Sequence, residues 1–168
     1  MANFLLFLFI FLTLTIKAET LIGRVFRVAD GDIITVLDEA KTQHKIRLDK
    51  IDAPEKKQAY GEVSKKYLSQ LVFGKEVKVL WDKKDRYGRI LGEVYCGSTN
   101  VNLQMVRCGY AWHYKHYDNT PTYALAEEAA STKKLGLWQD PNPMPPYEFR
   151  KVRKSMLPQN ANTIGSGL

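Results

Sequence analysis

Five short runs of alternating apolar and polar side chains place the strongest constraint on how this chain can fold. They lie between Leu21 and Cys96, and alternation with period two is typical of a strand that turns one face to a core. Asp30-Gly31 separates the first two runs and is typical of a tight hairpin turn, so we expect antiparallel strands there, with Asp32 just after the turn. The predicted strands cover residues 21–28, 33–37, 44–48, 77–81 and 90–96.

Three other stretches have the apolar spacing of helices. In the first, Val63 and Leu68 fall on one predicted face, and Gly74 suits a left-handed helix end. Thr120-Pro121 suits the N-cap and first turn of the last. The predicted helices cover residues 61–73, 100–108 and 120–135. One helix between the strands and two after them predict an OB-type α+β fold, a small, partly open five-stranded barrel with three helices packed on it.

The length and charge of the chain limit the classes of function. With 168 residues, of which 45% are hydrophobic, the chain can build one domain with a real core but has no room for a second catalytic domain. The net charge of +7 favours an acidic partner, of which nucleic acid is the commonest. Anionic membranes and simple solubility remain alternatives.

The first sixteen residues contain no charged side chain, and Phe4 to Ile16 is almost wholly apolar. That run is too short for a membrane span of about 20 residues but suits the apolar region of a secretory signal, with Ala18 before the cleavage site. We therefore expect residues 1–18 to be a signal peptide and the mature protein to be exported, periplasmic or extracellular, without stable membrane association. An uncleaved anchor is the alternative.

The C-terminal end differs in composition from the rest of the chain. A basic run from Arg150 to Lys154 is followed by uncharged residues from Met156 onward. We expect one folded domain over 19–146 and a disordered tail over 147–168, basic at first and then neutral.

Residues Arg47 to Glu55 place one guanidinium and three carboxylates within nine positions. Ile46 takes an inward position on the predicted strand, so Arg47 faces away from the core. Pro54 ends the strand and sets Asp52 and Glu55 at defined offsets. Such a set can hold a cation against a phosphate. The alternative is a strand end with solvated charges.

Four motifs resemble the thermonuclease, or staphylococcal nuclease-like, family in their order and approximate spacing, over about residues 21–138. The resemblance implies a five-stranded OB-type barrel with three helices, and a calcium-dependent phosphodiesterase that acts on DNA and RNA. The motifs are Asp30-Gly-Asp32, Arg47 with Ile51-Asp-Ala-Pro-Glu55, Asp85-Arg-Tyr-Gly-Arg89, and Gly136-Leu-Trp138.

The resemblance implies a calcium site. Asp32 and Asp52 match the family's calcium-binding carboxylates, and the backbone carbonyl of Ala53 matches a third ligand. Calcium takes six to eight oxygen ligands, so these three leave room for waters and a phosphate oxygen.

The resemblance also implies three catalytic residues. Glu55 matches the proposed general base, while Arg47 and Arg89 match the two arginines that hold the phosphate. Guanidinium groups present a bidentate fork where charge builds up in phosphodiester hydrolysis, which lysine does not. Because each side chain lies on a polar strand face or just past a strand end, we expect its removal to leave the core intact.

A segment rich in aromatic residues resembles the lining of the family's nucleotide pocket, where rings can stack on bases. We predict that Tyr117 contacts substrate, together with Arg86 and Tyr87 from the loop before Arg89; solvated turns are the alternative. The spacing of His113 and His116 would suit zinc, but further ligands at useful spacing are missing, so we expect a stacking or solvated role. The segment comprises Tyr110, Trp112, Tyr114 and Tyr117, interleaved with His113, Lys115 and His116.

Cys96 and Cys108 are the two cysteines of the chain and flank one predicted short helix. In an exported protein this arrangement favours a disulfide. The alternative is that Cys96 is a small buried residue on the inward face of its strand.

These observations predict an exported, monomeric, calcium-dependent nuclease with DNA and RNA as substrates. A catalytically silent OB-type nucleic-acid-binding module is the first alternative, but it should have lost some of Arg47, Glu55 and Arg89. A basic structural or membrane-surface protein is the second, and it would need no pair of Asp32 and Asp52.

Overall fold

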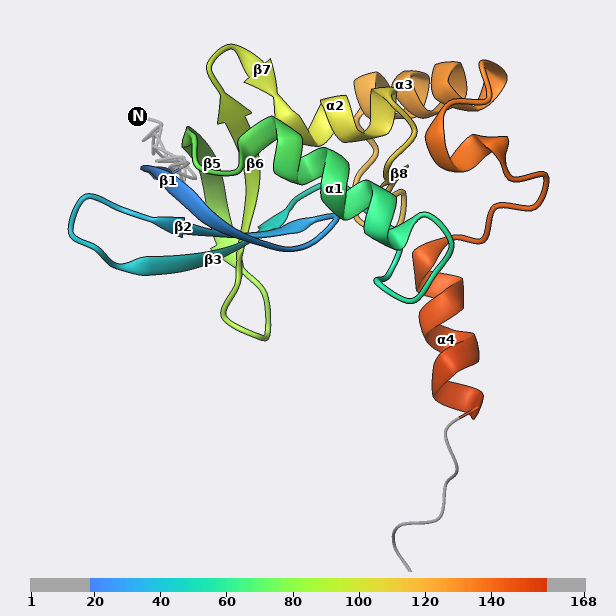
Figure 1. Ribbon diagram of the computed structural model, residues 1–168, viewed down its shortest axis with the longest axis horizontal. Coiled ribbons are helices and arrows are strands. Elements are labelled where there is room, and N and C mark those ends of the chain that lie inside the picture. The colour runs from blue at the N-terminus through green and yellow to red at the C-terminus, as the bar shows by residue number, and fades with distance from the viewer. Residues whose placement is uncertain (1–18, 157–168) are drawn as a thin grey trace, which may run out of the picture.

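The computed structural model describes residues 19–156 (Figure 1). The predicted signal peptide, residues 1–18, and the last part of the predicted tail, residues 157–168, lie outside this range. The strands are β1 (Glu19–Asp30), β2 (Ile33–Leu37), β3 (Gln43–Leu48), β4 (Ile51–Asp52), β5 (Glu76–Lys84), β6 (Ile90–Cys96), β7 (Thr99–Asn100) and β8 (Trp112–His113). The helices are α1 (Gly61–Val72), α2 (Val101–Arg107), α3 (Pro121–Thr132), the 3₁₀ helix η1 (Gly136–Gln139) and α4 (Pro146–Met156).

Five strands form the barrel, in the order β3-β2-β1-β5-β6, and they correspond to the five predicted strands. Neighbours in this order are antiparallel, and a parallel pairing of β3 with β6, in which Ile46 is opposite Ile90, joins the two ends. The barrel is therefore closed rather than partly open, and it fits the predicted OB-type fold.

The alternating apolar residues of the strands fill the interior. Val25, Ile34, Ile46, Val79 and Val94 have no solvent exposure, as expected when every second side chain of a closed sheet points inward. The predicted inward position of Ile46 is confirmed, and this leaves the next residue of β3 on the outer face.

Helices α1, α2 and α3 lie together on one side of the barrel (Figure 1). Helix α1 buries Ser64, Leu68 and Val72, whereas Val63 is 48% exposed, so the predicted inward position of Val63 is wrong. The hydroxyl of Ser64 donates a hydrogen bond to the carbonyl oxygen of Tyr110 at 2.6 Å, and this bond turns Ser64 rather than its neighbour toward the body.

The turn between β1 and β2 approaches α1 closely at Gly31. A Cβ at this position would run into the Ser64 side chain and would lie 2.8 Å from the Cβ of Ala53. Only glycine lets the hairpin turn, the helix and the segment after β4 come together here.

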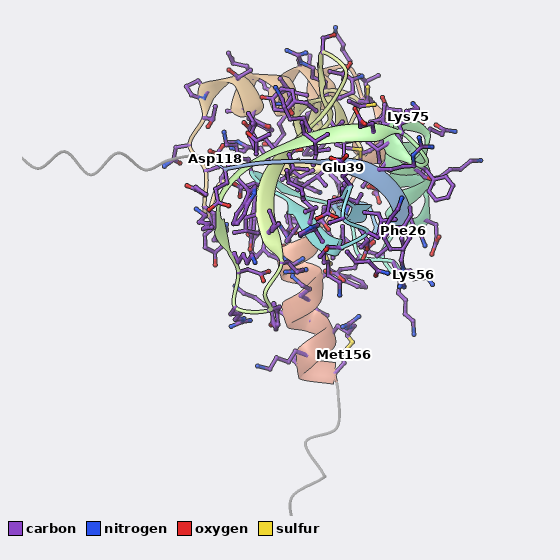
Figure 2. All side chains as sticks on the ribbon, turned by 90° about the vertical axis from the view of Figure 1, so that its left-hand side faces the viewer. Phe26, Glu39, Lys56, Lys75, Asp118 and Met156 are labelled. Atoms are coloured by element: carbon purple, nitrogen blue, oxygen red, sulfur yellow. The ribbon has the colours of Figure 1, made fainter. Side chains whose placement is uncertain are left out.

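Helix α4 is a correction to the sequence-based prediction. Residues 146–156 are helical, so the described chain has four α-helices instead of three, and residues 147–156 are not a disordered tail. Pro146 opens the helix, Glu148 lies in its first turn, and Arg153 lies in its last turn, an order that suits the helix dipole. The helix projects away from the barrel, with Met156 at its far end (Figure 2).

The two cysteines are free, so the predicted disulfide is wrong. Cys96 ends β6 and packs against the core, while Cys108 follows α2, which carries the chain about 10 Å along its axis. The Cys108 sulfur accepts hydrogen bonds from the Tyr67 hydroxyl at 3.1 Å and from the Gln104 amide at 3.2 Å.

Among residues 19–156, the helices are all too short or too polar to span a lipid bilayer.

Candidate active site

Arg47 joins two carboxylates that are far apart in the sequence. Its Nη2 lies 2.9 Å from Asp52 Oδ1 and 3.1 Å from Asp32 Oδ2, and its Nη1 donates to the carbonyl oxygen of Ile51 at 3.2 Å. The side chains of Asp32 and Asp52 are only 9% and 2% exposed. The structure thus brings three of the predicted site residues together on one guanidinium group.

Backbone pairing fixes the positions of the two aspartates. Ile33 is opposite Arg47 in the pairing of β2 with β3, which holds Asp32 beside β3. Asp52 is opposite Trp112 in the pairing of β4 with β8. The backbone N–H of Ala53 points at Asp32 Oδ2 across 3.4 Å, so Ala53 lies at the same place through its main chain.

Burial and charge act together on these groups. Burial raises the pKa of Asp52 above its usual value and the charge of Asp32 adds to this, although hydrogen bonds from Arg150 oppose it. Burial by itself would lower the pKa of Arg47, but Asp32 and Asp52 outweigh it and raise that pKa. Two carboxylates so close together, in little solvent, favour any cation that reaches them.

Asp30 adds a further carboxylate to this end of the barrel. Burial, together with the charges of Asp32 and Glu55, raises the pKa of Asp30 to about 6, against the lowering effect of the Gly31 N–H. The negative field of the cluster therefore extends beyond the residues that we predicted to bind metal or act in catalysis.

Arg150 of α4 also enters the cluster, and nothing in the local sequence pattern predicted it. Its Nη1 donates to Asp52 Oδ1 at 3.1 Å and to Glu55 Oε1 at 2.9 Å, and its Nη2 donates to Asp52 Oδ2 at 2.9 Å. The basic run was visible in the sequence, but its partners lie more than ninety residues away along the chain. Glu55 lies at the edge of the cluster, with its side chain 25% exposed.

The oxygens of the carboxylate cluster are of the type that binds a divalent ion. Residues 19–156 contain no group of three or more His, Cys, Asp or Glu side chains arranged to hold a metal. The buried carboxylates of Asp32 and Asp52 nevertheless meet at one guanidinium nitrogen of Arg47, and calcium accepts carbonyl, water and phosphate oxygens as well as carboxylates. The residues fit an open calcium site that solvent and a phosphate complete.

The side chain of Arg89 contacts a different carboxylate from those of the cluster. Its guanidinium binds Asp85, with Nε and Nη2 both 2.7 Å from Oδ2. In the parallel pairing of β3 with β6, Arg47 is opposite Leu91, so the backbone of Arg89 lies two positions before the residue that pairs with Arg47. The structure therefore places the two arginines on one side of the barrel but does not bring their guanidinium groups to one partner.

Arg86 and Tyr87 occupy the loop between β5 and β6. Tyr87 is 68% exposed, and the guanidinium carbons of Arg86 and Arg89 lie 4.9 and 5.4 Å from the centre of its ring. Arg86 and Tyr87 form an exposed stack with Arg89; among residues 19–156 their described contacts do not reach the carboxylate cluster.

The aromatic segment contributes a residue that we did not select from the sequence. The Arg47 guanidinium lies over the ring of Tyr114, 5.6 Å from its centre, and Tyr117 packs edge-on against Tyr114 at 4.9 Å. Tyr117 is 80% exposed. His116 lies 4.6 Å from the ring of Tyr147, which connects this segment to α4.

His113 has a structural role. It is buried, its Nε2 is 2.8 Å from Asp118 Oδ2, and its backbone N–H donates to Glu127. The expected solvated role of His113 is therefore wrong; its ring instead packs near that of Tyr123, with the ring centres 5.9 Å apart.

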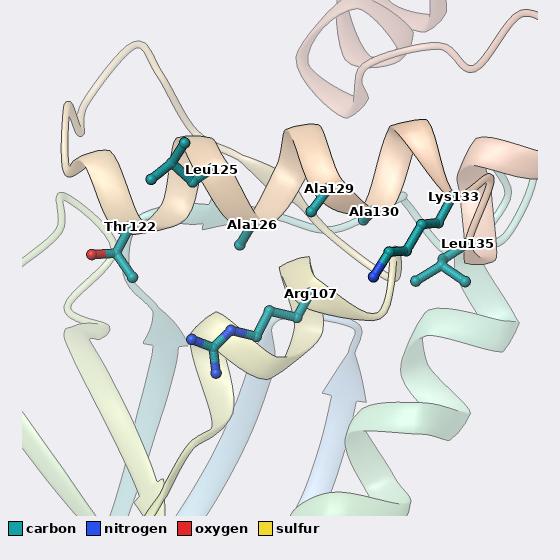
Figure 3. A pocket seen from close by; sticks show the side chains of 8 residues that line it. All are labelled: Arg107, Thr122, Leu125, Ala126, Ala129, Ala130, Lys133 and Leu135. Atoms are coloured by element: carbon teal, nitrogen blue, oxygen red, sulfur yellow. The ribbon is translucent and has the colours of Figure 1, made fainter.

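A groove of about 500 Å³ lies elsewhere, between α2 and α3 (Figure 3). Arg107 of α2 faces Ala126 of α3, and Lys133, directly after α3, across it. The predicted site residues do not line this groove, so it does not belong to the candidate active site.

Comparison with known proteins gives consistent matches. The sequence model of the family described as "Staphylococcal nuclease homologue" matches residues 45–140. A Haemophilus influenzae protein named "Uncharacterized endonuclease" is 44% identical over 86% of this chain and 82% of its own length. An Escherichia coli protein of the same name is 50% identical over 76% of this chain and 84% of its own. A Shigella flexneri "Micrococcal nuclease" is 41% identical over 79% of this chain and 82% of its own. By the extent of these matches and the barrel that carries them, the chain belongs to the staphylococcal nuclease family.

Proposed function

We propose that this protein is a calcium-dependent nuclease that hydrolyses phosphodiester bonds of DNA and RNA. The observation that carries the proposal is the shared position of Asp32, Arg47 and Asp52, two buried carboxylates on one guanidinium, with Glu55 at the edge. The nuclease names of its relatives support the reaction class. A binding module would have no use for a buried pair of carboxylates that repel nucleic acid.

Asp32, Asp52 and the carbonyl of Ala53 would hold the calcium ion. Bound calcium would polarise a phosphoryl oxygen and offset the charge that develops on it. Waters and the phosphate would complete the six to eight ligands that calcium takes.

Arg47 and Glu55 would act on the reacting groups. Asp52 fixes the plane of the Arg47 fork, which would then present its remaining donors to a non-bridging oxygen as charge builds up there. Glu55 lies one residue beyond Pro54 and is the most exposed carboxylate of the three, so it would accept the proton of the attacking water.

Arg89 would supply a second guanidinium from the neighbouring strand. Asp85 accepts hydrogen bonds from the side chain of Arg89 and from its backbone N–H at 3.0 Å, and so holds the loop in place. Tyr117, together with Arg86 and Tyr87, would contact the bases and phosphates of the bound strand on either side.

A cleavage assay tests the proposal. Single-stranded DNA and RNA would be incubated with the protein in calcium, in magnesium, or in chelator. We expect turnover in calcium alone, because magnesium demands near-ideal octahedral geometry that an open set of two carboxylates and a carbonyl does not impose. Equal turnover in magnesium would refute the calcium preference, and absence of cleavage in every condition would leave the binding module as the function.

The compartment is part of the proposal. The apolar run from Phe4 to Ile16, followed by Ala18, supports export, and the protein would act as a monomer. Fractionation of cells that express the full chain, with N-terminal sequencing of the product and light scattering of the purified protein, would test both statements. A chain that keeps Met1 in the cytoplasmic fraction would contradict export.

A further inference from the structure

We propose that α4 is an autoinhibitory latch, in which Arg150 occupies the cation position on Asp52 in the calcium-free protein and leaves it when calcium binds. The inference rests on the proposed function, since it concerns the same carboxylates. It assigns a role to a residue that lies outside all four motifs of the family resemblance.

Arg150 uses both carboxylate oxygens of Asp52. Nη1 lies 3.1 Å from Oδ1 and Nη2 lies 2.9 Å from Oδ2, a bidentate arrangement that leaves neither oxygen free on that side. Arg47 Nη2 already takes Oδ1 from another direction. A calcium ion coordinated by Asp52 would have to share these oxygens with a second cation, so Arg150 and calcium compete for one place.

The guanidinium of Arg150 also binds Glu55, the proposed general base. Nη1 of Arg150 lies 2.9 Å from Glu55 Oε1. The Glu55 oxygen that would face the attacking water is therefore occupied by a guanidinium N–H. One side chain thus engages a metal ligand and the group that would accept the proton, which is the arrangement expected of an inhibitor.

Only the first turns of α4 contact the body. Pro146 is its buried residue, Tyr147, Phe149 and Arg150 are half-buried, and the six side chains from Lys151 to Met156 are exposed. Tyr147 contacts His116, and the carbonyl oxygen of Met144 accepts a hydrogen bond of 2.6 Å from Gln58, both at the beginning of the helix. When Arg150 leaves Asp52, the helix can swing about this anchored end with few further contacts to break.

The charges explain why such a latch is useful. Asp32, Asp52 and Glu55 set three negative charges against the single positive charge of Arg47, and Arg150 supplies further positive charge until calcium arrives. Released, α4 carries a row of basic side chains beside the site, which suits a nucleic acid backbone. Calcium binding would therefore release α4 and open the site to the substrate.

Calcium affinity is the direct test. Calcium would be titrated calorimetrically into the wild-type chain, into Arg150→Gln and into Arg153→Ala, each shown to be folded by circular dichroism. Competition is reciprocal, so removing Arg150 should tighten calcium binding by about tenfold or more. Arg153 is exposed on the same helix, so Arg153→Ala changes the net charge equally and should alter the affinity less than about twofold.

Hydrogen exchange of the α4 amides gives a second readout. In the wild type, calcium should increase exchange over 147–156; in Arg150→Gln, exchange should already be fast without calcium. Arg150→Lys keeps the charge but not the fork, so it should fall between the two.

The possible outcomes distinguish a failure of the latch proposal from a failure of the nuclease proposal. If the wild type binds calcium and cleaves DNA while Arg150→Gln binds calcium with unchanged or weaker affinity, the latch is wrong and the nuclease proposal stands. If the wild type neither binds calcium nor cleaves, both are wrong. Calcium-independent exchange in α4 would also overturn the latch.

Discussion

Arg47 Nη2 lies 2.9 Å from Asp52 Oδ1, and the two side chains are 13% and 2% exposed, so the pair is a buried one. Losing one partner of such a pair leaves an uncompensated charge in a poorly solvated place. This corrects the expectation that Arg47 can be removed without cost to the fold, because the outer face of β3 is covered at this point.

Arg47→Ala should therefore lower the free energy of unfolding by about 3 kcal/mol, as measured by urea denaturation in the absence of calcium. Adding Asp52→Asn to the same chain should recover much of this loss, because it removes the stranded charge. Arg24→Ala, on the exposed part of β1, is the control and should change stability by less than about 0.5 kcal/mol. A loss in Arg47→Ala no larger than in the control would contradict the buried pair.

Glu55→Gln should lower kcat by about a hundredfold, since a positioned general base contributes 10²–10⁴-fold and the amide cannot accept the proton. Calcium affinity should not fall, because Glu55 is not among the proposed ligands. The variant would be assayed on single-stranded DNA at saturating calcium, with calcium binding measured on the same sample. Near wild-type turnover would remove Glu55 from the mechanism.

Tyr117→Ala should weaken substrate binding and leave the fold intact. The side chain is 80% exposed, so its removal creates no cavity, whereas one base stacked on an aromatic ring contributes about 1–3 kcal/mol. We expect a higher KM for single-stranded DNA with little change in kcat or in Tm. Phe at the same position should restore KM, and an unchanged KM in the alanine variant would assign Tyr117 to packing against Tyr114.

The raised pKa of Asp30 predicts how the stability of the fold depends on pH. Its folded-state pKa is raised to about 6 from an ordinary value near 3.8, so the fold prefers the protonated form. The stabilising contribution of protonated Asp30 is fully present below the pKa of the unfolded state and is lost as the pH rises through about 6. Asp30→Asn keeps the oxygen that accepts from Gly31 and should raise Tm at pH 7.5 but not at pH 3, in calcium-free buffer. Equal shifts at both pH values would contradict the raised pKa.

Both cysteines should titrate as free thiols in denaturant without added reductant, two per chain. Replacing Cys108 by alanine should cost only what its contacts with Tyr67 and Gln104 contribute, about 1 kcal/mol. If no free thiol is detected until the protein is reduced, Cys96 and Cys108 form a disulfide and the prediction is wrong.

The sequence predicted the features that depend on residues close in the chain and missed those that depend on contacts between distant segments. Period-two alternation identified the five barrel strands, and the run from Arg47 to Glu55 placed Arg47 and Asp52 in one candidate set, because both patterns depend on residues close in the chain. The closing pair of β3 with β6 and the contact of Arg150 with Glu55 depend on distant segments meeting, which no local pattern encodes. Helix α4 was missed because a basic run reads as a solvated tail unless its Pro146 and Glu148 are read as helix-start signals.

The parallel pairing of β3 with β6 also has a kinetic consequence. Ile46 and Ile90 belong to segments separated by α1 and β5, and pairings between such distant segments are entropically costly to form, so we expect this one late in folding. The strands that carry Arg47 and Arg89 come into register only at that step. A newly made chain therefore lacks the complete candidate site until its barrel has closed.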